Sequence, residues 1–300
     1  MPQGVRSVEQ SPSGTAKGNA AVRAIAAREF TDEILGGDYL AENFLTPLLK
    51  FIVKSPRART WLKKKRLSGG AYEYIVARSA YFDQLFKQAL QENYPQILLL
   101  GAGYDTRAYR FKDLIKDTHI IELDAPTTQQ QKKSCLFRAG ITIPDQVSLV
   151  PINFNIDSLQ AVLTKAGFDE TQKTFFIWEG VIYYLEPQAV DATLEFIRMN
   201  SPPGSILAFD YAVPISPDKY DMYYGVKELA KLMQALHPGE PGRFAVEEDE
   251  IATFLADRGF DIIEHHTEKD LEGQFLTTHD GSLLGRVTGC FRIVQAIVKT

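Results

Sequence analysis

The sequence contains little cysteine and no long apolar run, and both absences exclude classes of protein. Only two of its 300 residues are cysteines, Cys135 and Cys290, and they stand far apart without a CxxC spacing. A disulfide framework and a cysteine-ligated zinc site are therefore not expected. No apolar stretch approaches the ~20 residues that a membrane span needs, and the first residues lack the apolar core of a secretory signal. We expect a cytoplasmic protein without a membrane partner.

Positive charge is also scarce, because 33 Lys and Arg residues face 38 Asp and Glu residues and leave a formal net charge of -5. This balance argues against a dedicated nucleic-acid binder. Residues 54–66, KSPRARTWLKKKR, are a local exception that contains Trp61. Such a stretch is typical of a solvated helix face, and attraction of an acidic substrate is the alternative. Histidine is scarce as well. His265 and His266 are adjacent, so on a strand they point to opposite faces and, with His279, do not indicate a metal site.

Residues 96–110, QILLLGAGYDTRAYR, are the most informative stretch. Their apolar run suits a parallel strand buried on both faces, and the Gly-Ala-Gly turn allows a ligand to approach the backbone. The turn is not GxGxxG, because Thr106 stands where a third glycine would fall. About twenty residues later a second strand ends near Glu122, whose carboxylate is suited to ribose hydroxyls. The pattern predicts a nucleotide-type ligand at the carboxyl end of a central strand.

The rest of the chain predicts one doubly wound α/β domain over residues 19–300, after a disordered tail at 1–18. Residues 19–70 form a helical cap, and 211–246, rich in tyrosine and proline, form a lid insertion. Asp157 is expected to be the N-cap of a helix over residues 157–166. The link at 267–289 has few helical signals, which favours a closing hairpin with at least one antiparallel strand. The expected helices are 71–91, 126–138, 157–166, 187–199 and 247–259, and the later strands are 147–153, 174–178, 205–210, 260–265 and 291–299.

Several motifs follow one another in order: Arg78 with YFD at 81–83, GAGYDTRAYR at 101–110, ELDAP at 122–126, GFD at 167–169 and FIWEGVIYYL at 176–185. Together they resemble the S-adenosylmethionine-dependent methyltransferases of the leucine carboxyl methyltransferase-like family, which includes many bacterial O-methyltransferases. The resemblance is strong over residues 71–194. It implies a Rossmann-like, seven-stranded, mostly parallel sheet, with S-adenosylmethionine as cofactor and S-adenosylhomocysteine as product.

The resemblance also implies a role for each matching residue. Arg78, which periodicity alone would equally assign as a snorkelling side chain, would grip the methionine carboxylate of the cofactor. Glu122 would bind the ribose, and Glu179 would line the amino-acid end, unless it pairs with Arg107. Asp105 and Arg107 would brace the turn. Asn153 stands where the family usually has an aspartate, and its side-chain oxygen can accept the same adenine hydrogen bond. The expected cofactor-binding residues are Arg78, Gly101, Ala102, Gly103, Glu122, Leu123, Asn153, Phe154, Glu179 and Gly180.

Methyl transfer from a sulfonium is an in-line displacement, so alignment is the main requirement. A base is needed only when the acceptor is protonated. We expect an O-methyltransferase acting on a carboxylate, or on a phenol or enol hydroxyl, of a small-molecule or peptide acceptor. The alternatives are a nicotinamide-dependent oxidoreductase on a similar sheet and a non-catalytic S-adenosylmethionine-binding protein. The candidate catalytic residues are Tyr183, Tyr184, Tyr211 and His237, with Asp210 nearby.

Overall fold

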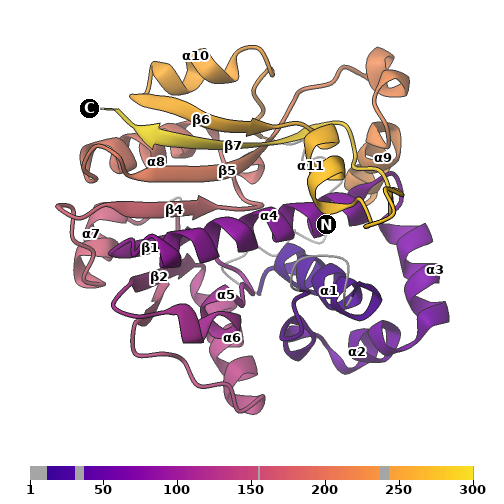
Figure 1. The fold of residues 1–300 in the computed structure, drawn as a ribbon, viewed down its shortest axis with the longest axis horizontal. Coiled ribbons are helices and arrows are strands. Elements are labelled where there is room, and N and C mark those ends of the chain that lie inside the picture. The colour runs from indigo at the N-terminus through magenta and orange to yellow at the C-terminus, as the bar shows by residue number, and fades with distance from the viewer. Residues whose placement is uncertain (1–11, 31–36, 155, 237–242, 300) are drawn as a thin grey trace, which may run out of the picture.

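The computed structural model describes residues 12–30, 37–154, 156–236 and 243–299. Their strands form one seven-stranded sheet in the order β3-β2-β1-β4-β5-β7-β6. Neighbours run parallel except that β7 is antiparallel to both β5 and β6. The predicted Rossmann-like sheet and its antiparallel end are therefore confirmed (Figure 1). The strands are β1 (Gln96–Leu100), β2 (His119–Asp124), β3 (Val147–Pro151), β4 (Thr174–Trp178), β5 (Ile206–Ala212), β6 (Phe260–His266) and β7 (Phe291–Val298).

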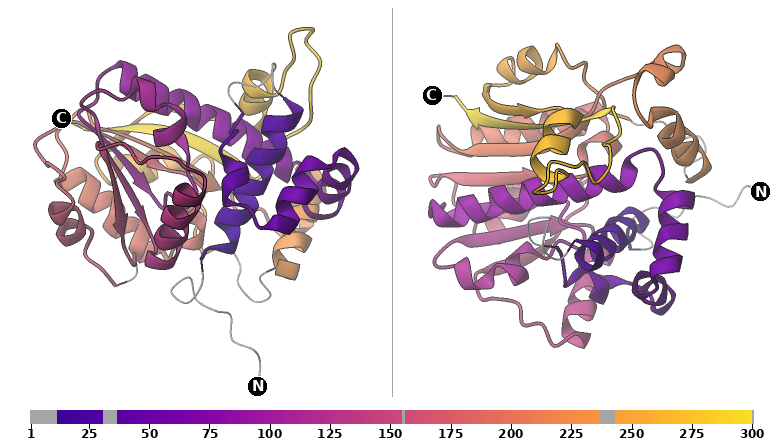
Figure 2. Two further views of the ribbon diagram at one scale, coloured as in Figure 1. Left: turned by 90° about the horizontal axis from the view of Figure 1, so that it is seen from below. Right: turned by 45° about the vertical axis from the view of Figure 1, so that its right-hand side comes forward.

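Helices cover both faces of the sheet (Figure 2). On one face lie α4 (Ala71–Gln91), α6 (Pro126–Arg138) and α11 (Glu268–Phe275). The other face carries α7 (Leu159–Lys165), α8 (Pro187–Met199) and α10 (Ile251–Ala256). The remaining helices are the short α5 (Arg107–Arg110) and those near the carboxyl ends of the parallel strands, namely α1 (Gly14–Glu29), α2 (Pro47–Lys54), α3 (Pro56–Arg66) and α9 (Val226–Leu236).

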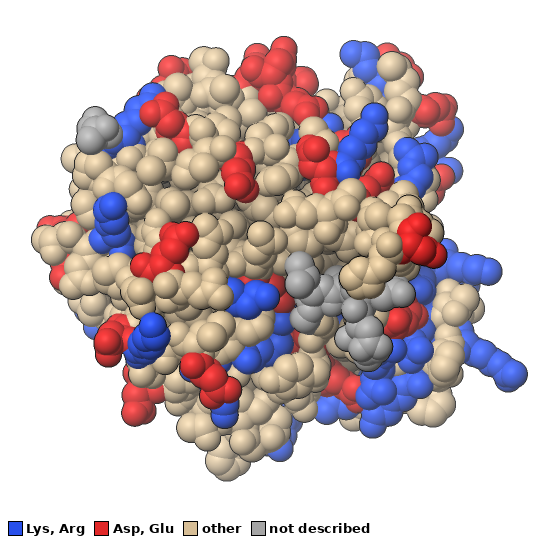
Figure 3. Space-filling view, in the orientation of Figure 1, with Lys and Arg blue, Asp and Glu red and all other residues tan. Residues whose placement is uncertain are grey.

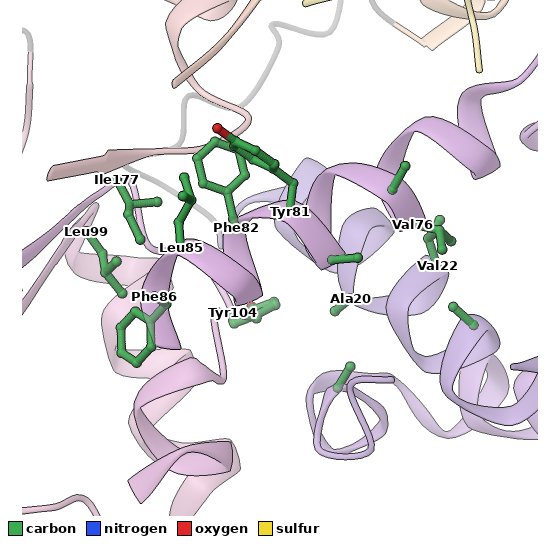
Figure 4. Packing of buried hydrophobic residues seen from close by; sticks show 14 of the residues in the cluster. Ala20, Val22, Val76, Tyr81, Phe82, Leu85, Phe86, Leu99, Tyr104 and Ile177 are labelled. Atoms are coloured by element: carbon green, nitrogen blue, oxygen red, sulfur yellow. The ribbon is translucent and has the colours of Figure 1, made fainter. Parts of the chain in front are cut away.

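Two apolar clusters, one on each face, hold these layers together. Successive strand residues point to opposite faces, so Leu99 of β1 joins the cluster beneath α4, whereas Leu98 joins the other. Figure 4 shows Phe86 of α4 packed close to Leu99. Burying one such side chain contributes about 1.5–3 kcal/mol, so α4 is held firmly against the sheet along its length. The polar residues of α4 are therefore held in fixed positions.

Several boundaries differ from the sequence prediction. Helix α1 begins at Gly14, inside the range predicted as tail, and the Ser13 hydroxyl caps it by accepting from Ala16 N at 3.1 Å; residues 1–11 lie outside the described residues. Ser158, not Asp157, caps α7, because its hydroxyl accepts from Ala161 N. The predicted lack of a helix in the link at 267–289 was wrong, since α11 occurs there. The bounds predicted for α4, α6, α8 and β4 are confirmed.

The segments expected to form a cap and a lid are also helical. The former contains α1, α2, α3 and the 3-10 helix η1 (Ala41–Phe44), and the latter contains η4 (Pro217–Met222) and α9. Within the described residues, no helix combines the length and the apolar character that a membrane span requires. The cytoplasmic location stays a prediction.

Candidate active site

The glycine turn after β1 crosses the end of β2. Gly101 and Gly103 have φ of +74° and +48°, in the left-handed region that glycine adopts most readily. A Cβ on Gly101 would lie 2.5 Å from Cγ2 of Val181. A Cβ on Gly103 would lie 3.2 Å from Cβ of Ala16 on α1 and 3.9 Å from Oδ2 of Asp124. The turn is therefore a cradle that a side chain would fill.

Asp124, the last residue of β2, presents its carboxylate to this turn. Its Oδ2 accepts from Gly103 N at 2.5 Å, and its Oδ1 accepts from Ala125 N at 2.7 Å. The side chain is half-buried, and this burial raises the pKa of Asp124 against the opposing effect of the two N–H groups. The carboxylate thus lies at the carboxyl end of a central strand, beside left-handed glycines, where nucleotide ribose binds in folds of this type.

Glu122 lies on the same side of β2, two residues earlier, but deeper. It is fully buried, and its Oε2 forms an ion pair with Nζ of Lys132, which is itself 1% exposed. Burial raises the pKa of Glu122, and Lys132 opposes this shift. The structure therefore places the predicted ribose-binding carboxylate in a buried pair beneath the surface that Asp124 forms.

Arg78 of α4 meets the carboxyl ends of β4 and β5. Its Nε donates to Oε1 of Glu179 at 3.1 Å, and its Nη1 donates to the Tyr183 hydroxyl at 3.0 Å and to Oδ2 of Asp210 at 3.1 Å. Gly180 makes room for this guanidinium, since a Cβ there would lie 3.1 Å from Nη2. We call Arg78, Glu179, Tyr183 and Asp210 the Arg78 cluster.

Asp210 is the fully buried anion of this cluster. Besides Arg78, it accepts from the Tyr74 hydroxyl at 2.5 Å and from Gly180 N at 2.6 Å. Burial lowers the pKa of Arg78, but Asp210 and its other neighbours outweigh that effect and raise it well above its usual range. The guanidinium is therefore permanently charged and held in one position.

Arg107 braces the cluster from the other side. Its Nη1 pairs with Asp105 and, at 2.8 Å, with Oε2 of Glu179, while its Nε donates to Oδ1 of Asp83 at 2.7 Å. Burial favours the neutral form of Glu179, but Arg107 and Arg78 outweigh it and lower the pKa of this carboxyl. The pairing of Glu179 with Arg107 that the sequence suggested as an alternative is present, and so is the bracing of the turn.

The predicted catalytic residues do not all gather at the cluster. Tyr184 adjoins Tyr183, with ring centroids 4.7 Å apart. Tyr211 lies elsewhere, because it follows Asp210 on a strand and faces the opposite side, where its hydroxyl is 2.9 Å from Nε2 of His265. His237 lies outside the described residues.

The other predicted cofactor residues surround the turn or lie beyond β3. Ala102 N donates to the Leu123 carbonyl at 2.8 Å, which ties the turn to β2. Asn153 follows β3, and its backbone N donates to Oδ2 of Asp157 at 2.8 Å. Phe154 packs, partly buried, against the apolar cluster below. The roles predicted for these residues stay predictions.

Sequence reasoning missed Asp83 and Asp124. Arg110 donates to Asp83 through Nη1 at 2.6 Å, so Asp83 is shared between two arginines. Its signal was a carboxylate inside the otherwise apolar YFD segment of α4. The signal for Asp124 was its place as the last residue of β2, directly before Ala-Pro, where a side chain emerges from the sheet.

A sequence model of the family described as "Leucine carboxyl methyltransferase" matches residues 16–198. The protein named "Putative S-adenosyl-L-methionine-dependent methyltransferase YktD" of Bacillus subtilis is 31% identical over 208 residues, covering 69% of this chain and 67% of its own. A relative from Mycolicibacterium smegmatis, also named as a putative S-adenosyl-L-methionine-dependent methyltransferase, is 28% identical over 227 residues, 71% of this chain and 67% of its own.

A crystal structure described as a putative methyltransferase from Thermobifida fusca superposes with a TM-score of 0.60. Sequence identity is 15%, and the superposition covers 97% of this chain and 96% of that one. This likeness concerns the fold. The family model and the sequence relatives favour the methyltransferase prediction over a nicotinamide-dependent oxidoreductase or a non-catalytic binding protein.

Proposed function

The chain belongs to the leucine carboxyl methyltransferase family and is an S-adenosylmethionine-dependent methyltransferase, and we propose that it methylates an oxygen atom of its acceptor. The observation that carries the proposal is the joint position of three groups at neighbouring strand ends: the glycine turn, the Asp124 carboxylate and the Arg78 cluster. S-adenosylmethionine supplies an electrophilic methyl group when bound. The residues of the chain bind and align it.

Asp124 is better suited than Glu122 to accept hydrogen bonds from the ribose hydroxyls. Its carboxylate is half-buried beside the glycine cradle, whereas Glu122 is fully buried and paired with Lys132. At the other end of the cofactor, Arg78 would hold the methionine carboxylate through Nη2, which makes none of its three bonds within the cluster. The ionised Glu179 would attract the ammonium group.

The electrostatics of the cluster favour an acceptor that is already anionic. Burial and the nearby Asp210 raise the pKa of Tyr183 well above its usual value, so this phenol stays protonated at neutral pH. The Asp210 oxygens already accept three hydrogen bonds, so they are engaged within the cluster. A carboxylate needs no deprotonation before it attacks, whereas a phenol or enol does. We therefore favour a carboxylate, and the name of the family agrees with this choice.

A pocket of about 480 Å³ beside the start of α4 is our candidate for the acceptor side. It is of the size that small-molecule sites usually have. Its wall continues toward the cluster: the Tyr224 carbonyl accepts from Gly289 N at 2.9 Å, and nearby Phe291 stacks on Tyr74 with centroids 4.2 Å apart. The residues that line it are Ser68, Gly69, Tyr220, Asp221, Tyr223, Tyr224, Gly225, Lys227 and Glu228.

The proposal is tested with the purified chain, S-adenosylmethionine labelled in its methyl group, and a panel of small carboxylic acids and phenols. We expect transfer to carboxylic acids, and the label should then be released as methanol by mild alkali, because methyl esters hydrolyse and aryl methyl ethers do not. Alkali-stable product would favour a phenol or enol. Label on nitrogen or sulfur only would contradict the proposal.

A further inference from the structure

Helices α2 and α3 carry a local charge opposite to that of the whole chain. Residues 47–66 contain no aspartate or glutamate, in a chain whose net charge is -5. Eight of these residues are basic: Lys50, Lys54, Arg57, Arg59, Lys63, Lys64, Lys65 and Arg66. Figure 3 shows blue side chains gathered at the lower right, where Figure 1 places these two helices.

Only some of these cations serve the fold. Arg59 and Lys63 pair with Glu29 of α1, at 3.3 Å and 2.7 Å, and so attach α3 to the body of the protein. In contrast, Lys64, Lys65 and Arg66 are exposed at the end of α3. Among the described residues, no ion pair joins these three, or Lys50 or Arg57, to a carboxylate.

Large apolar side chains are exposed on the same two helices. Leu48 and Phe51, three residues apart and so on one face of α2, are 69% and 70% exposed. Trp61 of α3 is 53% exposed, with Nζ of Lys65 lying 5.5 Å from its ring centroid. Leaving three such side chains in water forgoes the stabilisation that burial would bring. A solvated helix face explains the lysines but not these residues.

We propose that this surface, made of Leu48, Lys50, Phe51, Arg57, Trp61, Lys64, Lys65 and Arg66, binds an anionic lipid bilayer. An anionic bilayer matches both of its features, since the headgroups attract lysine and arginine while the interface accepts leucine, phenylalanine and tryptophan. Nucleic acid would pair with the cations but leave Leu48 and Phe51 in water. The proposal departs from the sequence prediction of no membrane partner, which rested on the lack of a spanning run, because peripheral binding needs no such run. The proposal does not depend on which acceptor is methylated.

The two tryptophans provide a direct reporter. Trp178 is fully buried, whereas Trp61 lies in the proposed surface, so a change in tryptophan emission on binding arises from Trp61. With vesicles of phosphatidylcholine and phosphatidylglycerol in equal parts, we expect co-sedimentation of the full chain and a blue shift of its emission. Vesicles of phosphatidylcholine alone should give neither. Trp61→Phe should still sediment but lose the blue shift.

Matched substitutions distinguish binding by this surface from a response to the overall charge of the protein. The triple variant K64Q/K65Q/R66Q should lower the partition coefficient on the mixed vesicles by about 100-fold. The variant K112Q/K133Q/K165Q removes the same charge from exposed positions elsewhere and should bind as the wild type does. Leu48→Ser with Phe51→Ser should weaken binding while keeping its salt dependence. Circular dichroism checks that each variant is folded.

Three results would overturn the proposal. One is no binding to the mixed vesicles by the folded wild type. The second is equal loss of binding in the two triple variants, which would indicate an unspecific response to net charge. The third is tighter binding to a short double-stranded DNA than to the mixed vesicles at the same salt concentration, which would assign the surface to nucleic acid.

Discussion

Arg78, Arg107 and Arg110 have side chains only 3% exposed, and each is held by carboxylates. At the end of α3, Lys64, Lys65 and Arg66 are exposed, and the described residues supply no carboxylate for them. The same kind of charge is thus structural in one region and solvent-facing in the other. Arg78 lies on α4, and Arg107 and Arg110 stand at the two ends of α5, whereas the other three are consecutive and cannot all turn inward from one helix.

The comparison shows where positive charge is costly to remove. A buried guanidinium that loses its place leaves carboxylates without compensation in a low-dielectric interior, which costs about 3–5 kcal/mol. An exposed ion pair is screened by water and contributes about 0–1 kcal/mol. Position within the fold, more than residue type, therefore decides what each arginine or lysine does.

The largest effect is expected from Arg107→Ala. The substitution leaves Asp83, Asp105 and Glu179 short of a partner, so it should lower the free energy of unfolding by about 3–5 kcal/mol in urea denaturation. The matched control is Arg258→Ala, which removes a half-exposed arginine that pairs with Asp191 at 2.8 Å and should cost below ~1 kcal/mol. Equal losses in the two variants would break the comparison.

The second effect distinguishes the roles of Asp124 and Glu122, the two carboxylates of β2, in cofactor binding. Asp124→Asn keeps the shape of the side chain but removes the charge offered to the ribose, so S-adenosylmethionine affinity should fall by about 1.5–3 kcal/mol, or at least tenfold. Glu122→Gln should leave the affinity nearly unchanged, because Glu122 faces Lys132. Calorimetric titration of both folded variants provides the measurement. A loss confined to Glu122→Gln would restore the assignment made from sequence.

The third effect is a pH dependence of stability. The pKa of Glu179 is lowered: burial opposes this, but Arg107 and Arg78 outweigh it. A carboxyl with a depressed pKa stabilises the fold above its unfolded pKa of about 4.3, and this contribution disappears as pH falls through the folded pKa. Glu179→Gln should therefore be less stable than the wild type at pH 7, with the difference shrinking below about pH 4.3. A constant difference in thermal unfolding across this range would show that charge is not the cause.

The sequence predicted the elements that local signals define. α6 and α8 begin at Pro126 and Pro187, residues that favour the first turn of a helix, and their bounds were confirmed. α11 was missed because its start depends on a capping box between Thr267 and Asp270 in a segment with little apolar periodicity. Hydrophobic periodicity fails as a predictor where a short polar cap, and not a hydrophobic face, determines the helix.

The site was predicted only as far as the motifs reached. Arg78 contacts Glu179 and Asp210, which lie 101 and 132 residues further along the chain, and only the assembled sheet brings their strand ends together. The sequence contains two carboxylates near the end of β2, Glu122 and Asp124, and only Glu122 was predicted to bind the ribose. The choice between them depends on Lys132 reaching Glu122 from α6, a tertiary contact that the spacing of the motif does not contain.

The smallest effect is expected at the exposed end of the comparison. K64Q/K65Q/R66Q removes cations that favour the negative end of the α3 dipole, but it also removes repulsion between neighbouring like charges. These contributions oppose each other, so the free energy of unfolding in urea at physiological salt should change by less than about 1 kcal/mol. A loss near that expected for Arg107→Ala would show that these charges hold the fold. A small change would show that these exposed charges beside Trp61 do not stabilise the fold. Vesicle binding would then be their expected role.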